Sequence, residues 1–197
     1  ICGEGLRYED GIFKDSKSIY FPGGTLETNM IELPPEVIVN DSYTISMWVR
    51  PQELHQWSSC LYVKFETGFF SICPLAWEGH ADFRIRDSRE VNGWYDASSC
   101  QLQPDLWWHF IISYNANTEI ATFFINGDVL AVINEVPTNR YVIRVALGGD
   151  VFQPSFIGNI CELVIYNEAK DYDFMQELHE SYINDSNFNG GPLKKLL

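Results

Sequence analysis

The stretch WWHFIISYNANTEIATFFINGDVLAVI, from Trp107 to Ile133, decides the fold. It holds two runs of alternating bulky residues joined by a polar turn, and side chains that alternate in this way lie on opposite faces of a β-strand. The Asn126-Gly127 pair that follows favours the positive φ angles of a type I′ turn, which sends the chain back as a third strand. The stretch therefore predicts a three-stranded antiparallel meander.

Further strands are expected along most of the chain. Short runs rich in aromatic and β-branched residues alternate with polar turns, a pattern typical of a β-sandwich or jelly roll. These runs cover residues 18–24, 43–51, 60–65, 68–73, 81–87, 93–99, 141–149 and 156–167. Trp48 and Trp108 lie in runs of this kind, so we expect both residues in strands rather than in loops.

One segment has a different period. Phe174, Leu178 and Tyr182 recur every four residues, which gives one apolar stripe on a short helix from Asp171 to Tyr182. We therefore expect an all-β fold, a two-sheet antiparallel jelly-roll sandwich with one short C-terminal helix.

Length and charge exclude several classes of protein. A chain of 197 residues fits one β-sandwich domain, which we place at residues 16–183, after a leading segment 1–15 from an upstream region and before a tail 184–197. Thirteen basic against 27 acidic residues give a net charge of −14, so the phosphates of nucleic acids and anionic membranes would be repelled. No apolar stretch has the length of a membrane span. We expect neither nucleic-acid binding nor membrane insertion.

The cysteines predict a disulfide but leave its partners open. None of the five forms a CxxC pair, and the histidines lack ligand spacing, so we expect no zinc site. An even-numbered loop around Glu66-Thr67 would place Cys60 and Cys73 opposite each other in a hairpin. Cys73 with Cys100 is the alternative pair.

Two glycosylation motifs add to this signal. Asn40 and Asn184 each begin an Asn-x-Ser sequon, the acceptor of N-linked glycans in secreted proteins. Together with the cysteines they favour an oxidising compartment. We expect an extracellular or cell-surface glycoprotein of the secretory pathway.

Three segments resemble, in order, the signature segments of laminin-G-like domains. They are YTISMWVRP (residues 43–51), LWWHFIISYNANTEIATFFINGDVLA (106–131) and LGGDVFQPSFIGNICELVIYNEAKDYDFMQEL (147–178). Laminin-G-like domains belong to the concanavalin-like jelly rolls, which also include pentraxins. The resemblance implies two stacked antiparallel sheets of six or seven strands each, with the first and last strands adjacent.

The sequence lacks the catalytic signature of the enzymes that share this fold. Glycoside hydrolases of this fold need two carboxylates in one cleft, and their Glu-x-Asp-x-x-Glu signature is absent here, since Glu162 has only Glu168 nearby. In DFRIRDSRE (residues 82–90) arginines stand between the carboxylates, so we interpret that run as a solvated strand face. We expect no enzyme, and a glycoside hydrolase is the weakest of three hypotheses.

The resemblance also suggests one metal ligand. Relatives bind calcium at the rim of the sandwich through carboxylates and carbonyls, and Asp150, after Gly148-Gly149, stands where such a ligand is expected. The loop offers only this carboxylate. Two interpretations of Asp150 therefore remain: a calcium ligand, or an aspartate that only stabilises the turn. We expect no other cofactor.

Two binding functions remain. The first is a non-catalytic extracellular module that binds protein partners or other modules of the same assembly, through loops 52–59, 76–81 and 87–94. The second is a glycan-binding, lectin-like module, with or without calcium, that uses Trp77, Trp94 and Tyr95. The two hypotheses differ in one observable: a lectin requires Trp77 and Trp94 to be exposed and to converge.

Overall fold

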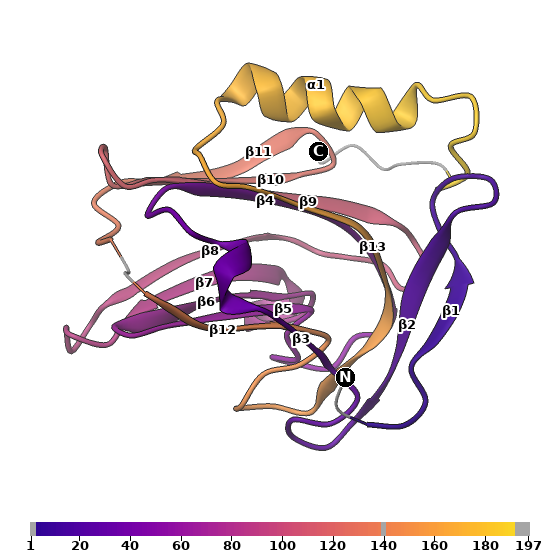
Figure 1. Cartoon of the computed structure of the whole chain (residues 1–197), viewed down its shortest axis with the longest axis horizontal. Helices are drawn as coiled ribbons and strands as arrows, with labels where there is room; N and C mark the ends of the chain where they lie inside the picture. Colours follow the sequence, from indigo (N-terminus) through magenta and orange to yellow (C-terminus); the bar gives the residue numbers. More distant parts are fainter. Residues whose placement is uncertain (1–2, 139–140, 192–197) are drawn as a thin grey trace.

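The computed structural model describes residues 3–138 and 141–191, which form two stacked antiparallel sheets (Figure 1). The seven-stranded sheet has the order β1 (Arg7–Asp10), β2 (Lys17–Gly24), β13 (Ser155–Tyr166), β4 (Tyr43–Glu53), β9 (Trp108–Asn115), β10 (Ile120–Ile125) and β11 (Asp128–Ile133). The six-stranded sheet has the order β3 (Ile31–Leu33), β12 (Val142–Leu147), β5 (Leu61–Phe65), β6 (Gly68–Cys73), β7 (Ala81–Asp87) and β8 (Trp94–Cys100).

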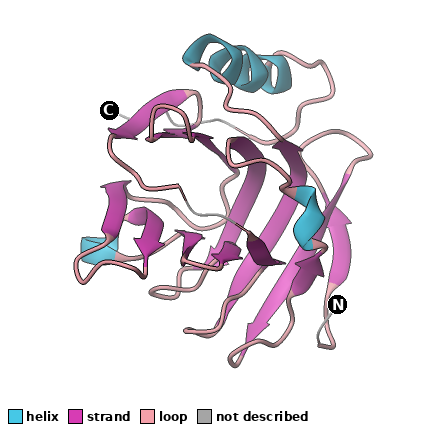
Figure 2. Cartoon of the chain, turned by 60° about the vertical axis from the view of Figure 1, so that its left-hand side comes forward, coloured by secondary structure: helices cyan, strands magenta, loops and turns pink. Residues whose placement is uncertain are grey.

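Among the described residues, helical structure is confined to three segments outside the sheets (Figure 2). They are the 3₁₀ turns η1 (Pro35–Val37) and η2 (Trp77–Gly79) and the helix α1 (Tyr172–Ile183). The Asp171 side chain accepts a hydrogen bond from the Phe174 amide at 3.0 Å and so caps α1 at its N-terminus. The described chain contains no helix that is long and apolar enough to cross a membrane.

The predicted fold class is confirmed. β9, β10 and β11 form the expected meander, and Asn126 and Gly127 turn the chain with φ angles of 53° and 84°. Trp48 lies in β4 and Trp108 in β9, as predicted. The late strand β13 pairs with the early strand β2, and β1 extends that sheet by one further edge strand.

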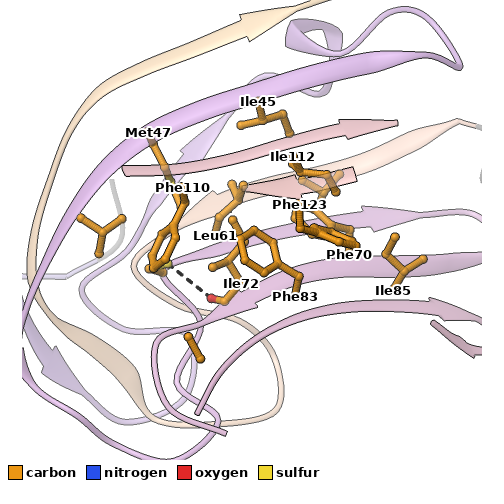
Figure 3. Close-up of a cluster of buried hydrophobic side chains, with 14 of the residues drawn as sticks. Ile45, Met47, Leu61, Phe70, Ile72, Phe83, Ile85, Phe110, Ile112 and Phe123 are labelled. Carbon is orange, nitrogen blue, oxygen red and sulfur yellow. Dashed lines mark hydrogen bonds between the residues drawn. The ribbon is translucent and has the colours of Figure 1, made fainter. Parts of the chain in front are cut away.

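The core lies between the two sheets, where their inner faces meet (Figure 3). Phe83 from the six-stranded sheet packs against Phe110 and Phe123 from the other sheet, with ring centroids 5.7 and 4.7 Å apart. Aliphatic side chains from both sheets fill the space around these rings, among them Ile45, Met47, Leu61, Ile72, Ile85 and Ile112. Burial of this apolar surface is the main source of stability.

A second buried cluster lies under α1, on the outer face of the seven-stranded sheet. The Trp48 ring stacks on His109, with centroids 4.6 Å apart, and His109 Nδ1 lies 2.9 Å from Nδ1 of His179 on the helix. Ser46 Oγ contacts His109 Nε2 at 2.7 Å. Desolvation lowers the pKa of His109 well below its usual value and the pKa of His179 to about 4. Both rings are therefore neutral near pH 7.

The cysteine prediction is not borne out by the geometry. The Glu66-Thr67 loop has two residues, since Phe65 pairs with Gly68, but Cys60, Cys73, Cys100 and Cys161 are all free thiols. Cys60 Sγ donates to the Ile72 carbonyl at 3.4 Å, whereas Cys73 Sγ donates to the Trp57 carbonyl at 3.5 Å. The two sulfur atoms are thus engaged with different backbone acceptors, and neither predicted pair is formed. Cys2 lies outside the described residues.

Both sequon asparagines lie at the surface. Asn40 and Asn184 are exposed, and Asn184 is the residue that follows α1. Asn40 Nδ2 donates to the Asn167 carbonyl at 2.6 Å. Glycosylation at either position stays a prediction.

The neutral histidine pair predicts a loss of stability in acid. Unfolded histidine binds a proton below about pH 6.5, whereas His179 in the fold binds one only near pH 4, so the free energy of unfolding falls as pH drops through that window. We expect a loss of about 2 kcal/mol from His179 between pH 6.5 and 5. Denaturant titrations at the two pH values should show a smaller loss in His179→Gln than in the wild type. Equal losses in both proteins would contradict this account.

Candidate functional site

An open groove lies on the outer face of the six-stranded sheet. In β7, Phe83 and Ile85 enter the core, so the alternation of side chains leaves Arg84 and Arg86 on the outer face. The groove encloses about 850 Å³, within the usual size range of ligand sites. Its lining residues are Trp57, Lys64, Phe69, Trp77, Arg84, Arg86, Ser88, Trp94, Asp96, Phe152 and Gln153.

Strand register builds the floor of the groove as two rows. Lys64, Phe69, Arg86 and Trp94 face one another in turn across β5, β6, β7 and β8. The next row runs through Tyr62, Ser71, Arg84 and Asp96. Each row therefore combines aromatic and charged or polar side chains on one surface.

Aromatic rings of the walls and of the floor contact one another. Trp57 and Trp77 meet edge to face with centroids 4.8 Å apart, and Phe69 contacts both Trp94 and Phe152 at 5.7 and 5.3 Å. Trp77 is 61% exposed and Trp94 is 44% exposed. An exposed apolar patch of several rings bordered by polar groups is typical of a ligand-binding groove.

Three loops predicted from the sequence meet at this groove. Trp57 comes from loop 52–59, Trp77 from loop 76–81, and Ser88 and Trp94 from residues 87–94. Trp77 and Trp94 are thus exposed and line the same groove, which is the arrangement that the lectin hypothesis requires.

Tyr95 does not join them. It follows Trp94 in β8, so its side chain lies on the opposite face of the sheet, half-buried against the core. Sequence reasoning found the loop that carries Trp57 without singling out this residue, and it missed Lys64, Arg84 and Phe152. The alternation in ADFRIRD did indicate that Arg84 and Arg86 share a face with each other, and this signal was available.

The run DFRIRDSRE is not a solvated strand face. Asp82 and Asp87 are buried, with 0% and 1% exposure. Asp87 forms an ion pair with Arg89 at 2.7 Å, which lowers the pKa of Asp87. Asp82 has no such partner, and both of its carboxylate oxygens lack a hydrogen bond within the described protein.

Arg84 is held by aromatic rings rather than by carboxylates. Its guanidinium lies 4.8 Å from the ring centre of Trp57, 5.0 Å from that of Trp94 and 5.7 Å from that of Phe69. These cation–π contacts fix the position of the charge. Ring faces supply no oxygen acceptor, and Arg84 Nε is buried without a hydrogen bond in the described structure.

Two carboxyl groups beside Arg84, those of Asp82 and Asp96, have pKa values above the usual range of aspartate. Desolvation, reinforced by the charge of Asp96, raises the pKa of Asp82 to about 7, against the lowering effect of Arg84. Desolvation raises the pKa of Asp96 to about 6, again opposed by Arg84. Asp96 is the one carboxylate among the described residues that line the groove. The two-carboxylate arrangement of a glycoside hydrolase is therefore not seen in the lining.

Glu162 lies elsewhere. It sits in β13 at an irregularity between Cys161 and Val164, with a φ of 49°. β13 belongs to the other sheet, so Glu162 is not among the described residues that line the groove.

Asp150 supports a turn that carries part of the groove wall. It is 2% exposed, and Oδ1 accepts hydrogen bonds from the amides of Phe152 and Gln153 at 2.6 and 2.9 Å. Ser59 Oγ donates to Oδ2. The described residues contain no group of three or more His, Cys, Asp or Glu side chains that could hold a metal ion. Calcium binding at Asp150 stays a prediction from the family resemblance alone.

The unpaired Asp82 predicts a stability that falls as pH rises. Its pKa is about 3.8 in the unfolded chain and about 7 in the fold, so the folded state binds more protons between these values and loses this advantage as pH rises through 7. Asn mimics the protonated carboxyl without titrating. We expect Asp82→Asn to be more stable than the wild type at pH 8, by roughly 2–4 kcal/mol, and to match it at pH 4.

Thermal and denaturant unfolding at both pH values would measure this difference. The wild type at pH 4 is the internal control, since its Asp82 is already protonated there. A variant that is less stable than the wild type at pH 8 would show that the Asp82 charge is compensated.

Comparison with known proteins agrees with this architecture. A family model described as the concanavalin A-like lectin/glucanases superfamily matches residues 23–172. The search of curated proteins returned no match.

Several solved structures are similar to the chain. Domain 4 of AbnA, a GH43 extracellular arabinanase from Geobacillus stearothermophilus in complex with arabinotriose, has a TM-score of 0.74 at 24% identity, covering 90% of this chain and 82% of that one. The Ruminococcus gnavus IT-sialidase CBM40 bound to α2,3 sialyllactose has a TM-score of 0.66 at 15% identity, covering 82% and 96%. A pentraxin from Limulus polyphemus has a TM-score of 0.58 at 12% identity, covering 85% and 79%.

Proposed function

Since the chain belongs to the concanavalin A-like lectin/glucanase superfamily, we propose that it is a non-catalytic module that binds carbohydrate in the groove on the six-stranded sheet. One observation carries this proposal. Trp77 from the turn η2 and Trp94 from the start of β8 are both exposed, and they line one groove that also presents charged side chains.

The chemistry of the groove suits a sugar. A pyranose or furanose ring has apolar C–H patches that pack on aromatic faces, and hydroxyl groups at its edge that need hydrogen-bond partners. Trp57, Trp77 and Trp94 supply the aromatic surface, and Asp96 and Gln153 supply polar atoms beside it. Ligand sites commonly combine an apolar wall with a few polar groups that fix orientation.

The structural neighbours are consistent with this proposal. Two of them were solved with arabinotriose or sialyllactose bound. At 24% and 15% identity they share the fold with this chain, and the proposal itself rests on the groove. Because glycans and glycoconjugates are abundant outside cells, an extracellular or cell-surface location is part of the proposal.

Protein binding, the other hypothesis, would use the same loops. Loops 52–59, 76–81 and 87–94 surround the groove, so a protein partner would contact Trp57, Trp77 and Trp94. Protein interfaces are larger and generally flatter, with an apolar centre and a polar rim. A concave groove of about 850 Å³ favours a small ligand or the end of a chain.

Substitution of the exposed tryptophans should weaken binding while leaving the fold intact. In a glycan array followed by calorimetry, we expect Trp77→Ala and Trp94→Ala each to weaken binding of the best oligosaccharide at least tenfold, which is about 1.4 kcal/mol. Tyr8→Ala is the matched control, because Tyr8 is a 77% exposed aromatic residue on the edge strand β1 of the other sheet.

Three results would count against the proposal. Tight glycan binding that survives both tryptophan substitutions would move the site elsewhere. Absence of binding across the array, with a protein recovered through the three loops, would favour the protein-binding hypothesis. Turnover of an oligosaccharide by the intact chain would overturn the non-catalytic assignment.

A further inference from the structure

Basic side chains in this acidic protein are distributed unevenly. Most of those described form ion pairs with carboxylates, namely Arg7, Lys17, Arg50, Arg89, Arg144 and Lys170. Four described basic residues form no ion pair with a described carboxylate, and they are Lys14, Lys64, Arg84 and Arg86. Three of these four line the groove.

The position of these charges is built into the sheet. Lys64 and Arg86 belong to one row of the floor and flank Phe69, and Arg84 belongs to the next row. Arg86 is anchored by its own loop, since its guanidinium donates to the carbonyls of Asp87 and Glu90. These carbonyl acceptors hold the side chain in place without neutralising its charge.

Arg84 forms no ion pair with a described carboxylate, although its charge lowers the pKa values of the nearby Asp82 and Asp96. Three aromatic rings surround its guanidinium, and its Nε is buried without a hydrogen bond in the described structure. The buried Nε is out of reach of a ligand, but Arg84 is only half-buried and lines the groove, so an oxyanion there would meet the accessible part of its guanidinium. Hydrogen bonds between charged groups are stronger than neutral ones.

Asp96 only partly offsets this charge. It is the one carboxylate among the described lining residues, against Lys64, Arg84 and Arg86. Asp82 is buried beside Arg84 and has a pKa of about 7, and even when it is ionised three positive charges face two negative ones. The chain as a whole carries a net charge of −14. Its distant charges are screened within about 8 Å at physiological ionic strength, so contacts inside the groove decide whether an anion binds.

Cation–π packing alone does not account for the cluster. It explains Arg84 and Arg86, which lie over the Trp94 ring at 5.0 and 5.2 Å. Lys64 makes no cation–π contact with a described ring, yet it lines the same groove. It lies at the end of the row that is opposite to Trp94. A shared anionic ligand accounts for all three residues.

We propose that the groove binds a sugar bearing an oxyanion, a carboxylate or a sulfate, and that Arg84 and Lys64 contact this group while the tryptophans pack on the sugar ring. The inference rests on the proposed function, because it names the class of glycan for the same groove. Arg86 adds charge from its anchored position.

The test compares three sets of oligosaccharides of matched length on the intact chain. One set carries uronic acids, one carries sulfate esters, and one is neutral. Calorimetry at pH 7.5 and low salt should show at least tenfold tighter binding of one anionic set over the neutral set. The affinity for that set should fall as the salt concentration rises, whereas the affinity for neutral sugars should change little.

Charge substitutions locate the contact. Lys64→Gln and Arg84→Gln should each reduce the preference for anionic over neutral sugars at least threefold. Lys14→Gln is the matched control, because this substitution makes the same change in net charge. Lys14 is an exposed lysine without an ion pair, and it lies in the turn between β1 and β2 of the other sheet. Lys64→Arg keeps the positive charge and should retain the preference. It tests the charge without altering Arg84, whose loss could displace Trp57 and Trp94.

The outcomes separate this inference from the proposed function. Equal binding of neutral and anionic sugars, lost in Trp77→Ala, would overturn the inference and leave the proposed function intact. An anionic preference that survives both charge substitutions would overturn the assignment of Arg84 and Lys64. Binding of no sugar in any set would overturn both proposals. The choice between the two anionic sets identifies the carboxylate or the sulfate as the recognised group.

Discussion

The contact of Phe83 with Phe110 and Phe123 joins the two sheets, and the groove depends on it. Because Phe83 packs on these rings, Ala81 and Ile85, which lie on the same face of β7, also point into the core. Because successive side chains of a strand lie on opposite faces, Arg84 and Arg86 are then forced outward, beside Phe69 of β6 and Trp94 of β8 in the neighbouring strands. A shift of one residue in the register of β7 would bury two arginines and dismantle both the core and the site. Stability and ligand binding are thus set by the same alternation.

The sequence predicted those parts of the molecule that local pattern controls. The meander from Trp107 to Ile133, the strand positions of Trp48 and Trp108, and the helix after Asp171 all follow from short-range periodicity and turn chemistry. The three rim loops were also found, because they combine aromatic and polar residues between strands. These features need no knowledge of which strands pair.

What the sequence left open depends on long-range pairing. The groove collects residues as distant as Trp57, Arg84 and Phe152, and only the order of strands in the sheet brings them together. Tyr95 was grouped with Trp94 because the two are adjacent, yet adjacency in a strand separates their side chains. The cysteine prediction had the correct hairpin loop but could not foresee that Cys60 and Cys73 would turn to different backbone acceptors.

The turn at Asp150 has a consequence for how the groove meets a ligand. Ser59 donates to the Asp150 carboxylate and Ser58 donates to the Pro154 carbonyl at 2.8 Å, so loop 52–59 is tied to the turn that carries Phe152. The Trp57 amide donates in turn to the Leu75 carbonyl at 2.7 Å, next to the loop that carries Trp77. Hydrogen bonds therefore hold the walls of the groove together in the absence of a ligand. Such preorganisation means that little conformational entropy is lost on association, so even a few contacts can yield measurable affinity.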